Sequence, residues 1–300
     1  MFGHSIKEWT LAIRPWSFPA SLTPVVVTLG LLYWRSSVEP MDCNWVNGFL
    51  AALGMVIFQA SANLISDYFD FQHGVDREDT FGSPNLTQGL FAPREILFYG
   101  IFVLALGAVL GLFLVWRTNV RLLYFGACGI LFVLLYPFFK FRALGDAVIF
   151  VAFSILPILG TTFVVTGAID AKNLVLAIPI GLITVAILHA NNWRDIRTDA
   201  RARIKTFSML IGSPASAILY VFELLFPFIW LGAAAIIFHG IPVWTLLSLI
   251  ALPLAIKAVK TAVTRTDDCA AICDLDVQTA QLQLVFGLTL STSFLVAAWM

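Results

Sequence analysis

Long apolar segments recur along the whole chain and exclude a water-soluble fold. A helix needs about 20 apolar residues to cross a bilayer, and runs of about this length cover residues 17–34, 46–66, 95–116, 119–139, 145–167, 172–190, 215–238, 241–260 and 279–299. These runs do not alternate between apolar and polar residues, so they predict helices rather than barrel strands. Hydrophobic residues make up 60% of the 300 residues and charged residues only 12%, a composition that a soluble domain could not bury. We therefore predict a single domain over residues 1–300, an all-α polytopic membrane protein with about nine transmembrane helices.

Lysine and arginine are distributed unevenly over the segments that connect the nine runs. With the N-terminus inside, fourteen of the eighteen basic residues fall in cytoplasmic segments. Because cytoplasmic loops are enriched in Lys and Arg, we expect the N-terminus in the cytoplasm and, in a bacterium, location in the inner (plasma) membrane. The net charge is zero and no basic patch suggests nucleic acid, so the expected surroundings are the lipid bilayer, with no protein partner predicted.

An acidic stretch follows directly on the second apolar run, at residues 60–79. Asn63, Asp67 and Asp70 are spaced i, i+4 and i+7 and share one face of a helix. Asp76 comes after Gly74, a residue at which a helix can end. Carboxylates at the end of a membrane helix need partners, and their density here suggests bound cations.

A second acidic stretch follows the sixth apolar run, at residues 189–206. Asn191, Asp195 and Asp199 are spaced i, i+4 and i+8, again on one helical face, and the predicted orientation puts both stretches on the cytoplasmic side. If the two helix ends meet, they offer the oxygen ligands that Mg²⁺ prefers, and Mg²⁺ often shares its ligands with substrate phosphates. Basic residues that could hold the same phosphates accompany the second stretch: Arg194, Arg197, Arg201, Arg203 and Lys205.

Other polar residues near the apolar runs allow two interpretations each. Arg14, at a non-helical junction before Pro15, is either a positive-inside anchor or a diphosphate contact. Tyr136 and Lys140 are spaced i, i+4, and are either an interfacial tyrosine with a snorkelling lysine or part of a site. Glu223 lies inside the seventh run, where it either packs in its protonated form or lines a cavity.

Four further acids, interpreted as a solvated loop, precede the last run: Asp267, Asp268, Asp274 and Asp276.

The two acidic motifs, at residues 67–76 and 191–199, resemble those of the UbiA superfamily of intramembrane prenyltransferases. The element Tyr-Pro-Phe-Phe-Lys at residues 136–140 is similar to another signature of that superfamily. Within it, Arg14-Pro-Trp-Ser-Phe-Pro-Ala, the step from Asp70 to Asp76 through Gly74, Thr87-Gln-Gly-Leu and the Asn-Asn-x-Arg-Asp run at 191–195 resemble most closely the MenA branch, the 1,4-dihydroxy-2-naphthoate polyprenyltransferases. The resemblance extends from residue 9 to about residue 212.

This resemblance implies a helix bundle around a central cavity open to the cytoplasmic side, and Mg²⁺-dependent transfer of a polyprenyl group from a polyprenyl diphosphate to an aromatic acceptor. The acceptor implied is 1,4-dihydroxy-2-naphthoate, giving demethylmenaquinone in menaquinone biosynthesis. The implied metal ligands are Ser66 (where many members carry Asn), Asp70, Asp76, Asn191, Asp195 and Asp199. The residues expected to act in catalysis are Arg14, Asp67, Tyr136 and Lys140. Those expected to bind substrate are Asn63, Arg142, Arg194 and Lys205.

Other functions stay open at this level. Members of the same superfamily use other acceptors, namely 4-hydroxybenzoate, homogentisate, chlorophyllide, haem or a glycerol lipid, and an intramembrane terpene cyclase is also conceivable. A cation-coupled transporter would explain acids in a membrane protein, but it predicts them near the bilayer midplane. An interpretation in which the acids only cap helices and solvate loops leaves unexplained why both stretches share a helix-face spacing and a membrane side.

Overall fold

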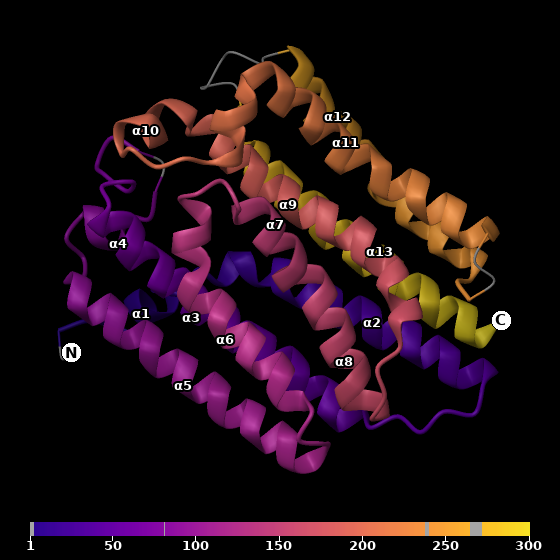
Figure 1. Ribbon diagram of the computed structural model, residues 1–300. Coiled ribbons are helices and arrows are strands. Elements are labelled where there is room, and N and C mark those ends of the chain that lie inside the picture. Colours follow the sequence, from indigo (N-terminus) through magenta and orange to yellow (C-terminus); the bar gives the residue numbers. More distant parts are fainter. Residues whose placement is uncertain (1–2, 81, 238–239, 265–271) are drawn as a thin grey trace.

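A computed structural model describes residues 3–80, 82–237, 240–264 and 272–300 and confirms the all-α prediction (Figure 1). Nine helical segments within these ranges are long and apolar enough to cross a membrane. The α-helices are α1 (Ile6–Ala12), α2 (Phe18–Val38), α3 (Trp45–Gln72), α4 (Pro84–Thr87), α5 (Pro93–Arg117), α6 (Leu122–Lys140), α7 (Gly145–Phe150), α8 (Leu156–Thr166), α9 (Ala177–Arg194), α10 (Ile196–Arg201), α11 (Phe207–Ile237), α12 (Leu252–Thr264) and α13 (Leu275–Trp299). Tighter or wider turns join them at η1 (Pro15–Ser17), η2 (Val151–Ile155), η3 (Ala171–Leu176) and η4 (Val243–Ala251).

Local sequence signals set several helix ends. Ser5 and Glu8 form a capping box at the start of α1, in which side chains satisfy backbone N–H groups that have no partner within the helix. The side chain of Asn44 accepts a hydrogen bond from the backbone of Asn47 at the start of α3. Gly74, just beyond α3, has a φ of 66°, the left-handed conformation that glycine adopts at little cost. The expectation that the chain turns at Gly74 is confirmed.

Not every predicted span is a regular α-helix. The fifth consists of α7, the single π-helical turn η2 and α8. The sixth and eighth begin as 3₁₀-helices, η3 and η4, before they continue as α9 and α12. Such changes of helical pitch are invisible to hydropathy, which registers only the length and polarity of a run.

The helices pack around several groups of buried apolar side chains, two of which position the polar end of the bundle. The larger group joins α2, α9, α11, α12 and α13, and includes Ile180, Leu224 and Phe286. The smaller group holds α1 and the segment around α4 against α3 and α5, through Leu64 and Leu86 among others. The fold therefore fixes α1 and α4 beside the end of α3 that carries the first acidic stretch.

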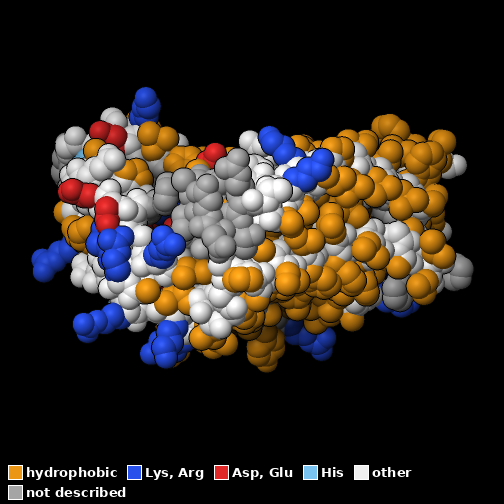
Figure 2. All heavy atoms as spheres, turned by 90° about the horizontal axis from the view of Figure 1, so that it is seen from above, with side chains coloured by type: hydrophobic (Ala, Val, Ile, Leu, Met, Phe, Trp, Pro, Cys, Tyr) orange, Lys and Arg blue, Asp and Glu red, His pale blue; other side chains and the backbone are white. Residues whose placement is uncertain are grey.

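Large apolar side chains also cover much of the outer surface, as membrane helices require. Phe98, Leu112 and Ile229 are among those left exposed. Figure 2 shows hydrophobic side chains over most of the visible face, whereas Lys, Arg, Asp and Glu gather mainly towards one end. Together with the nine long apolar helices, this surface makes the chain a multi-pass integral membrane protein.

We expect Gly181→Ala to destabilise the bundle. Gly181 lies in α9, and a Cβ atom added there would stand 2.5 Å from Cε2 of Phe150 and 2.7 Å from Oγ of Ser154. Overpacking of this kind costs about 1–3 kcal/mol, so the melting temperature of the detergent-solubilised protein should fall. The matched control is Gly232→Ala in α11, where nothing lies within 4 Å of the added atom and the higher helix propensity of alanine should raise the melting temperature slightly. An equal response of the two variants would contradict the close α7–α9 packing.

Candidate active site

The two acidic stretches, 110 or more residues apart in sequence, meet at one end of the bundle. α4 and α10 both lie at this end in Figure 1. Nη2 of Arg77, beyond α3, donates to the carbonyl oxygen of Thr198 in α10 at 3.3 Å. Arg201 of α10 in turn forms an ion pair with Asp79 at 2.7 Å. These contacts hold the two motifs side by side, as the shared-site hypothesis requires.

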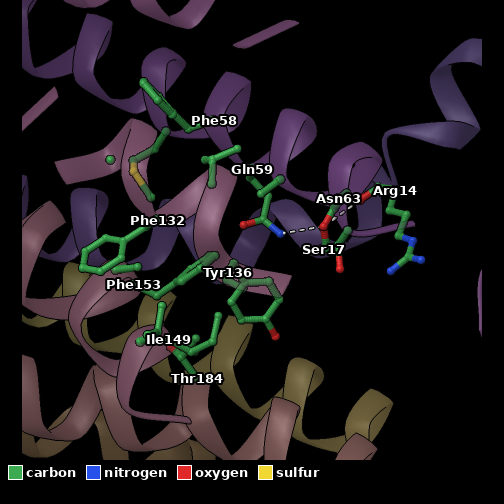
Figure 3. Close-up of a pocket in the computed structure, with 18 of the residues that line it drawn as sticks. Arg14, Ser17, Phe58, Gln59, Asn63, Phe132, Tyr136, Ile149, Phe153 and Thr184 are labelled. Atoms are coloured by element: carbon green, nitrogen blue, oxygen red, sulfur yellow. Dashed lines mark hydrogen bonds between the residues drawn. The ribbon is translucent and has the colours of Figure 1, made fainter. Parts of the chain in front are cut away.

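A cavity of about 1100 Å³ opens between them and continues into the bundle. Of the predicted site residues, those that line it are Arg14, Asn63, Ser66, Asp70, Asp76, Tyr136, Lys140, Asn191, Arg194, Asp195 and Asp199. Its inner wall is apolar and includes Phe58, Phe132, Ile149 and Phe153. Figure 3 shows these apolar side chains on one side of Tyr136, and Gln59, Asn63 and Arg14 on the other. The cavity therefore has a charged region at one end and an apolar region at the other.

Arg14 is fixed at this charged region by the turn between α1 and α2. Its backbone has a φ of 54°, which confirms the predicted non-helical junction, and its guanidinium forms an ion pair with Asp67. Asn63 supports the turn, because its side-chain amide donates to the carbonyl oxygen of Ile13 and to Oγ of Ser17, both at 2.9 Å. Asn63 thus positions the loop that carries Arg14.

Asp67 is buried behind Arg14 and does not line the cavity. Its second carboxylate oxygen accepts a hydrogen bond from Nδ2 of Asn85 at 3.2 Å. With both oxygens engaged by protein groups, Asp67 has the geometry of a residue that orients Arg14. The catalytic role expected of Asp67 from the sequence would need these contacts to open.

Lys140 brings a second positive charge to the cavity from the end of α6. Its Nζ lies 3.0 and 2.9 Å from the two carboxylate oxygens of Asp70, and Oγ of Ser66 donates to the same carboxylate at 3.1 Å. Tyr136, one turn earlier in α6, also lines the cavity. The predicted i, i+4 pair of Tyr136 and Lys140 therefore faces the site.

Asp76 is held by the loop that follows α3. Its Oδ2 accepts from the backbone N–H of Ser83 at 3.1 Å, and a Cβ on Gly82 would stand 1.9 Å from Oδ1, so a larger residue at position 82 would displace this carboxylate. Burial, with the negative charge of Asp70 as the next cause, raises the pKa of Asp76 from 3.8 to about 6.

The second motif places Asp199 and Asp195 differently. α9 ends at Arg194, and α10 then carries Asp199 into a buried position. Burial, followed by the charge of Asp195, raises the pKa of Asp199 from 3.8 to about 7. Asp195 is instead paired with Arg194, whose Nη2 lies 2.7 Å from Oδ2.

Two predicted substrate-binding residues lie away from the cavity. Arg142 and Lys205 are exposed and absent from its lining, and their backbones form an isolated bridge beyond α6. The guanidinium of Arg142 stacks on the ring of Phe138 at 3.6 Å from the ring centroid. Arg142 follows the 136–140 element in sequence and Lys205 follows the second acidic motif, but the sequence could not show which way their side chains point.

Sequence reasoning missed two contributors to the site. Asn85 binds Asp67 from the loop that covers the first motif, and its position in the chain gives no sign of this contact. Asp276 was interpreted as part of a solvated loop, but it lines the cavity and pairs with Arg194 at 3.3 Å. Asp274 is exposed, whereas Asp267 and Asp268 lie outside the described residues.

The donor set suits a hard divalent cation such as Mg²⁺. Asp76 and Asp199 both line the cavity, and neither forms an ion pair within the part of the chain that the structure describes. Burial and neighbouring carboxylates raise the pKa of both groups more than the positive charge of Lys140 lowers it. The residues with oxygen atoms that would hold Mg²⁺ are Ser66, Asp70, Asp76, Asn191, Asp195 and Asp199.

Comparison with known proteins places the chain among intramembrane enzymes. The model of the UbiA prenyltransferase family matches residues 21–299. UbiA prenyltransferase domain-containing protein 1 of Rattus norvegicus is 34% identical over 287 residues, which are 94% of this chain and 81% of the rat protein.

Solved structures share the fold at low sequence identity. A UbiA homolog from Aeropyrum pernix K1 has a TM-score of 0.70 at 14% identity, over 92% of this chain and 97% of that chain. A UbiA homolog from Archaeoglobus fulgidus, bound to DMAPP and Mg²⁺, has a TM-score of 0.60 at 14% identity, over 95% and 99% of the two chains.

We expect Mg²⁺ affinity to fall steeply between pH 8 and pH 5.5, because protons compete for Asp76 and Asp199, whose pKa values are about 6 and 7. If both must be ionised, linkage gives a decrease on the order of 100-fold, measured by calorimetric titration. In Asp199→Asn only protonation of Asp76 still competes with the metal, so the affinity should decrease only roughly 5-fold over the same pH range. A pH-independent affinity would refute these assignments.

The same shifts have the opposite effect on the metal-free protein. Between pH 4 and pH 7, roughly, the folded state binds protons that the unfolded state does not, since an unfolded aspartate has a pKa near 3.9. Stability should therefore be higher at pH 5 than at pH 8, and be lost as the pH rises through about 6 to 7.

Proposed function

The chain belongs to the UbiA prenyltransferase family, and we propose that it transfers a polyprenyl group from a polyprenyl diphosphate to an electron-rich aromatic acceptor. That it is a prenyltransferase follows from the family match over residues 21–299. The observation that carries the finer proposal is the continuous cavity, in which acids and bases at one end lead to an apolar wall. A polyprenyl diphosphate has the same division into a charged head and an apolar tail.

The charged end accounts for the diphosphate. Phosphates bind where Lys and Arg are fixed near carboxylates that share a divalent cation with them. Arg14, Lys140 and Arg194 all line the cavity beside such carboxylates. The homolog from Archaeoglobus fulgidus carries DMAPP and Mg²⁺, which supports a prenyl diphosphate and Mg²⁺ as ligands here.

The reaction breaks one bond and forms another. The allylic C–O bond cleaves, its electron pair leaves with the diphosphate, and the first prenyl carbon becomes cation-like. A nucleophilic ring carbon of the acceptor then forms the new C–C bond. Bound Mg²⁺ would supply positive charge to the departing diphosphate. Lys140 and Arg14, fixed by Asp70 and Asp67, would stabilise the same developing negative charge from preset positions.

For the acceptor we propose 1,4-dihydroxy-2-naphthoate, on the resemblance of the motifs to the MenA branch. Attack from the ring carbon that carries the carboxylate, followed by loss of CO₂, returns electrons to the ring and gives demethylmenaquinol, the two-electron reduced form of demethylmenaquinone. The name of the rat relative gives no acceptor, so other aromatic acceptors are alternatives for the test below.

We also propose, from the distribution of Lys and Arg, that the charged end faces the cytoplasm.

The activity test uses purified protein in detergent or lipid with a polyprenyl diphosphate, an acceptor, and Mg²⁺ or EDTA. We expect a metal-dependent prenylated naphthoquinol, with Asp70→Asn and Asp199→Asn each lowering kcat/KM at least about 100-fold. Asp42→Asn, an exposed acid before the start of α3, is the matched control and should keep full activity.

A comparison of acceptors tests the MenA-like choice of acceptor separately from prenyl transfer itself. 1,4-Dihydroxy-2-naphthoate and 1,4-dihydroxynaphthalene differ only in the carboxylate, so preference for the first supports the MenA-like reaction. Product from other aromatic acceptors alone would refute that choice and keep the family activity. Folded protein that cleaves no diphosphate with any acceptor would contradict the proposal.

The apolar wall should limit the length of the prenyl chain. Ala152 lines the cavity near Phe153, and Ala152→Phe would fill part of it. We expect the ratio of kcat/KM for a long donor to that for a ten-carbon donor to fall about 10-fold, since a few displaced methylene contacts are each worth about 0.8 kcal/mol. Ala147→Phe, at an exposed position of α7 outside the cavity, is the control. An unchanged ratio in Ala152→Phe would place the tail elsewhere.

A further inference from the structure

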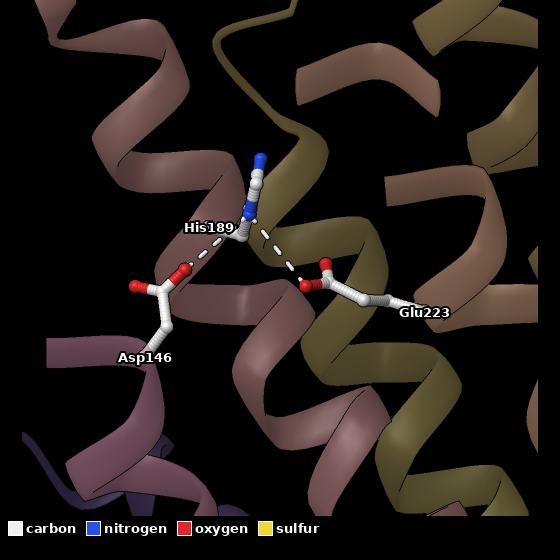
Figure 4. A group of neighbouring side chains, drawn as sticks. All are labelled: Asp146, His189 and Glu223. Atoms are coloured by element: carbon white, nitrogen blue, oxygen red, sulfur yellow. Dashed lines mark ion pairs between the residues drawn. The ribbon is translucent and has the colours of Figure 1, made fainter. Parts of the chain in front are cut away.

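Three ionisable side chains lie inside the bundle, away from the cavity. Asp146 is in α7, His189 in α9 and Glu223 in α11, and none of them lines the cavity. The side chain of His189 is fully buried, and 3% of Glu223 and 14% of Asp146 are exposed. Figure 4 shows His189 between the two carboxylates.

One ring nitrogen faces both acids. Nδ1 of His189 lies 3.4 Å from Oδ2 of Asp146 and 3.6 Å from Oε1 of Glu223. A single N–H could donate to only one of them well, and neither ring nitrogen has a hydrogen-bond partner among the described residues. Oδ2 of Asp146 and Oε2 of Glu223 also have none there. Each buried polar atom without a hydrogen-bond partner would lower the stability of the fold by about 1–3 kcal/mol.

A metal ion would satisfy this arrangement. One ligand atom from each residue lies within 4.8 Å of the other two. Tetrahedral Zn²⁺, with bonds of about 2.0–2.2 Å, holds its ligand atoms about 3.3–3.6 Å apart. The two distances from Nδ1, 3.4 and 3.6 Å, match this spacing.

The charges agree with the geometry. Two carboxylates, a neutral imidazole and a divalent cation sum to zero, whereas two carboxylates and a protonated imidazole leave a net negative charge inside a membrane bundle. The imidazole nitrogen distinguishes the cluster from the all-oxygen set at the cavity mouth, because it favours Zn²⁺ and similar ions over Mg²⁺.

We propose that Asp146, His189 and Glu223 form a binding site for a divalent transition-metal ion, for which Zn²⁺ is the best match. The ion fastens α7, α9 and α11 together, with a further ligand such as water completing its coordination. Oδ1 of Asp146 is left for Nδ2 of Asn192, which donates to it at 3.5 Å, so the ligand is oriented by a neighbour as in other metal sites.

The position of the site suggests what the ion does. His189 lies two residues before Asn191, and Asp146 follows Lys140 by six residues. The ion would therefore fix the backbone segments that bring both residues to the cavity, without touching a substrate. Its role is structural, and its binding does not depend on the proposed activity.

The first test is the zinc content of untagged protein, purified in detergent without chelator and measured by mass spectrometry of the elements. We expect about one zinc per chain, and less than about 0.2 in the isosteric variant Glu223→Gln. The matched control Glu39→Gln, at an exposed position, and Asp195→Asn at the cavity mouth should both keep the zinc.

A second measurement covers the case in which Glu223→Gln fails to fold. The wild-type protein is stripped with chelator and titrated with Co²⁺ alone, which should give the visible spectrum of a four-coordinate ion with nitrogen and oxygen ligands, resist excess Mg²⁺, and raise the melting temperature. Zinc-free wild type without a saturable Co²⁺ spectrum would overturn the proposal. So would zinc that remains in both His189→Gln and Glu223→Gln.

Discussion

Ion pairing of carboxylates at the ends of membrane helices is the interaction on which the arrangement of this protein depends. Asp67 and Asp70 are buried, where an unpaired charge would cost several kcal/mol. Arg14 and Lys140 neutralise them from segments that lie on either side in sequence. These pairs hold the N-terminal turn and the end of α6 against α3, so that the same contacts assemble both the fold at this end and the positive charge that a diphosphate needs.

The carboxylates that line the cavity are not fully neutralised by the nearby Lys and Arg, and this excess of negative charge favours binding of a cation. Asp76 and Asp199 keep raised pKa values of about 6 and 7 because burial and neighbouring acids outweigh the nearby bases. A site that is fully neutral by itself would have little affinity for a divalent cation. A site with excess carboxylates gains stability when the cation arrives, and the cation in turn attracts the diphosphate, so metal and donor would each favour binding of the other.

Sequence predicted the parts of this structure that follow from long runs and regular spacing. The nine spans, the turn at Gly74 and the non-helical junction at Arg14 all follow from local chain properties. It could not predict contacts made by single polar residues across the bundle. Asn85 binds Asp67 from a loop, and Asp276 reaches Arg194 from the ninth span. Conversely, Arg142 follows Lys140 by only two residues but does not line the cavity: α6 ends at Lys140, so helical spacing no longer determines where its side chain points.

Helix α9 shows how one element can carry two solutions to buried charge. At its end, Asn191 and the following Asp195 line the cavity. Ligands can enter and leave this cavity, so the positive charge that neutralises the acids can be a bound cation that exchanges. Half a turn earlier, His189 is buried between Asp146 and Glu223, where the proposed metal ion would satisfy both carboxylates. The sequence analysis singled out only Glu223, because a carboxylate inside a membrane span is energetically unfavourable. It gave no reason to connect Glu223 with a histidine in another helix. That connection is tertiary, and the proposed metal ion would explain how a carboxylate in the middle of a membrane helix is tolerated, because acids inside a membrane protein need a partner of opposite charge.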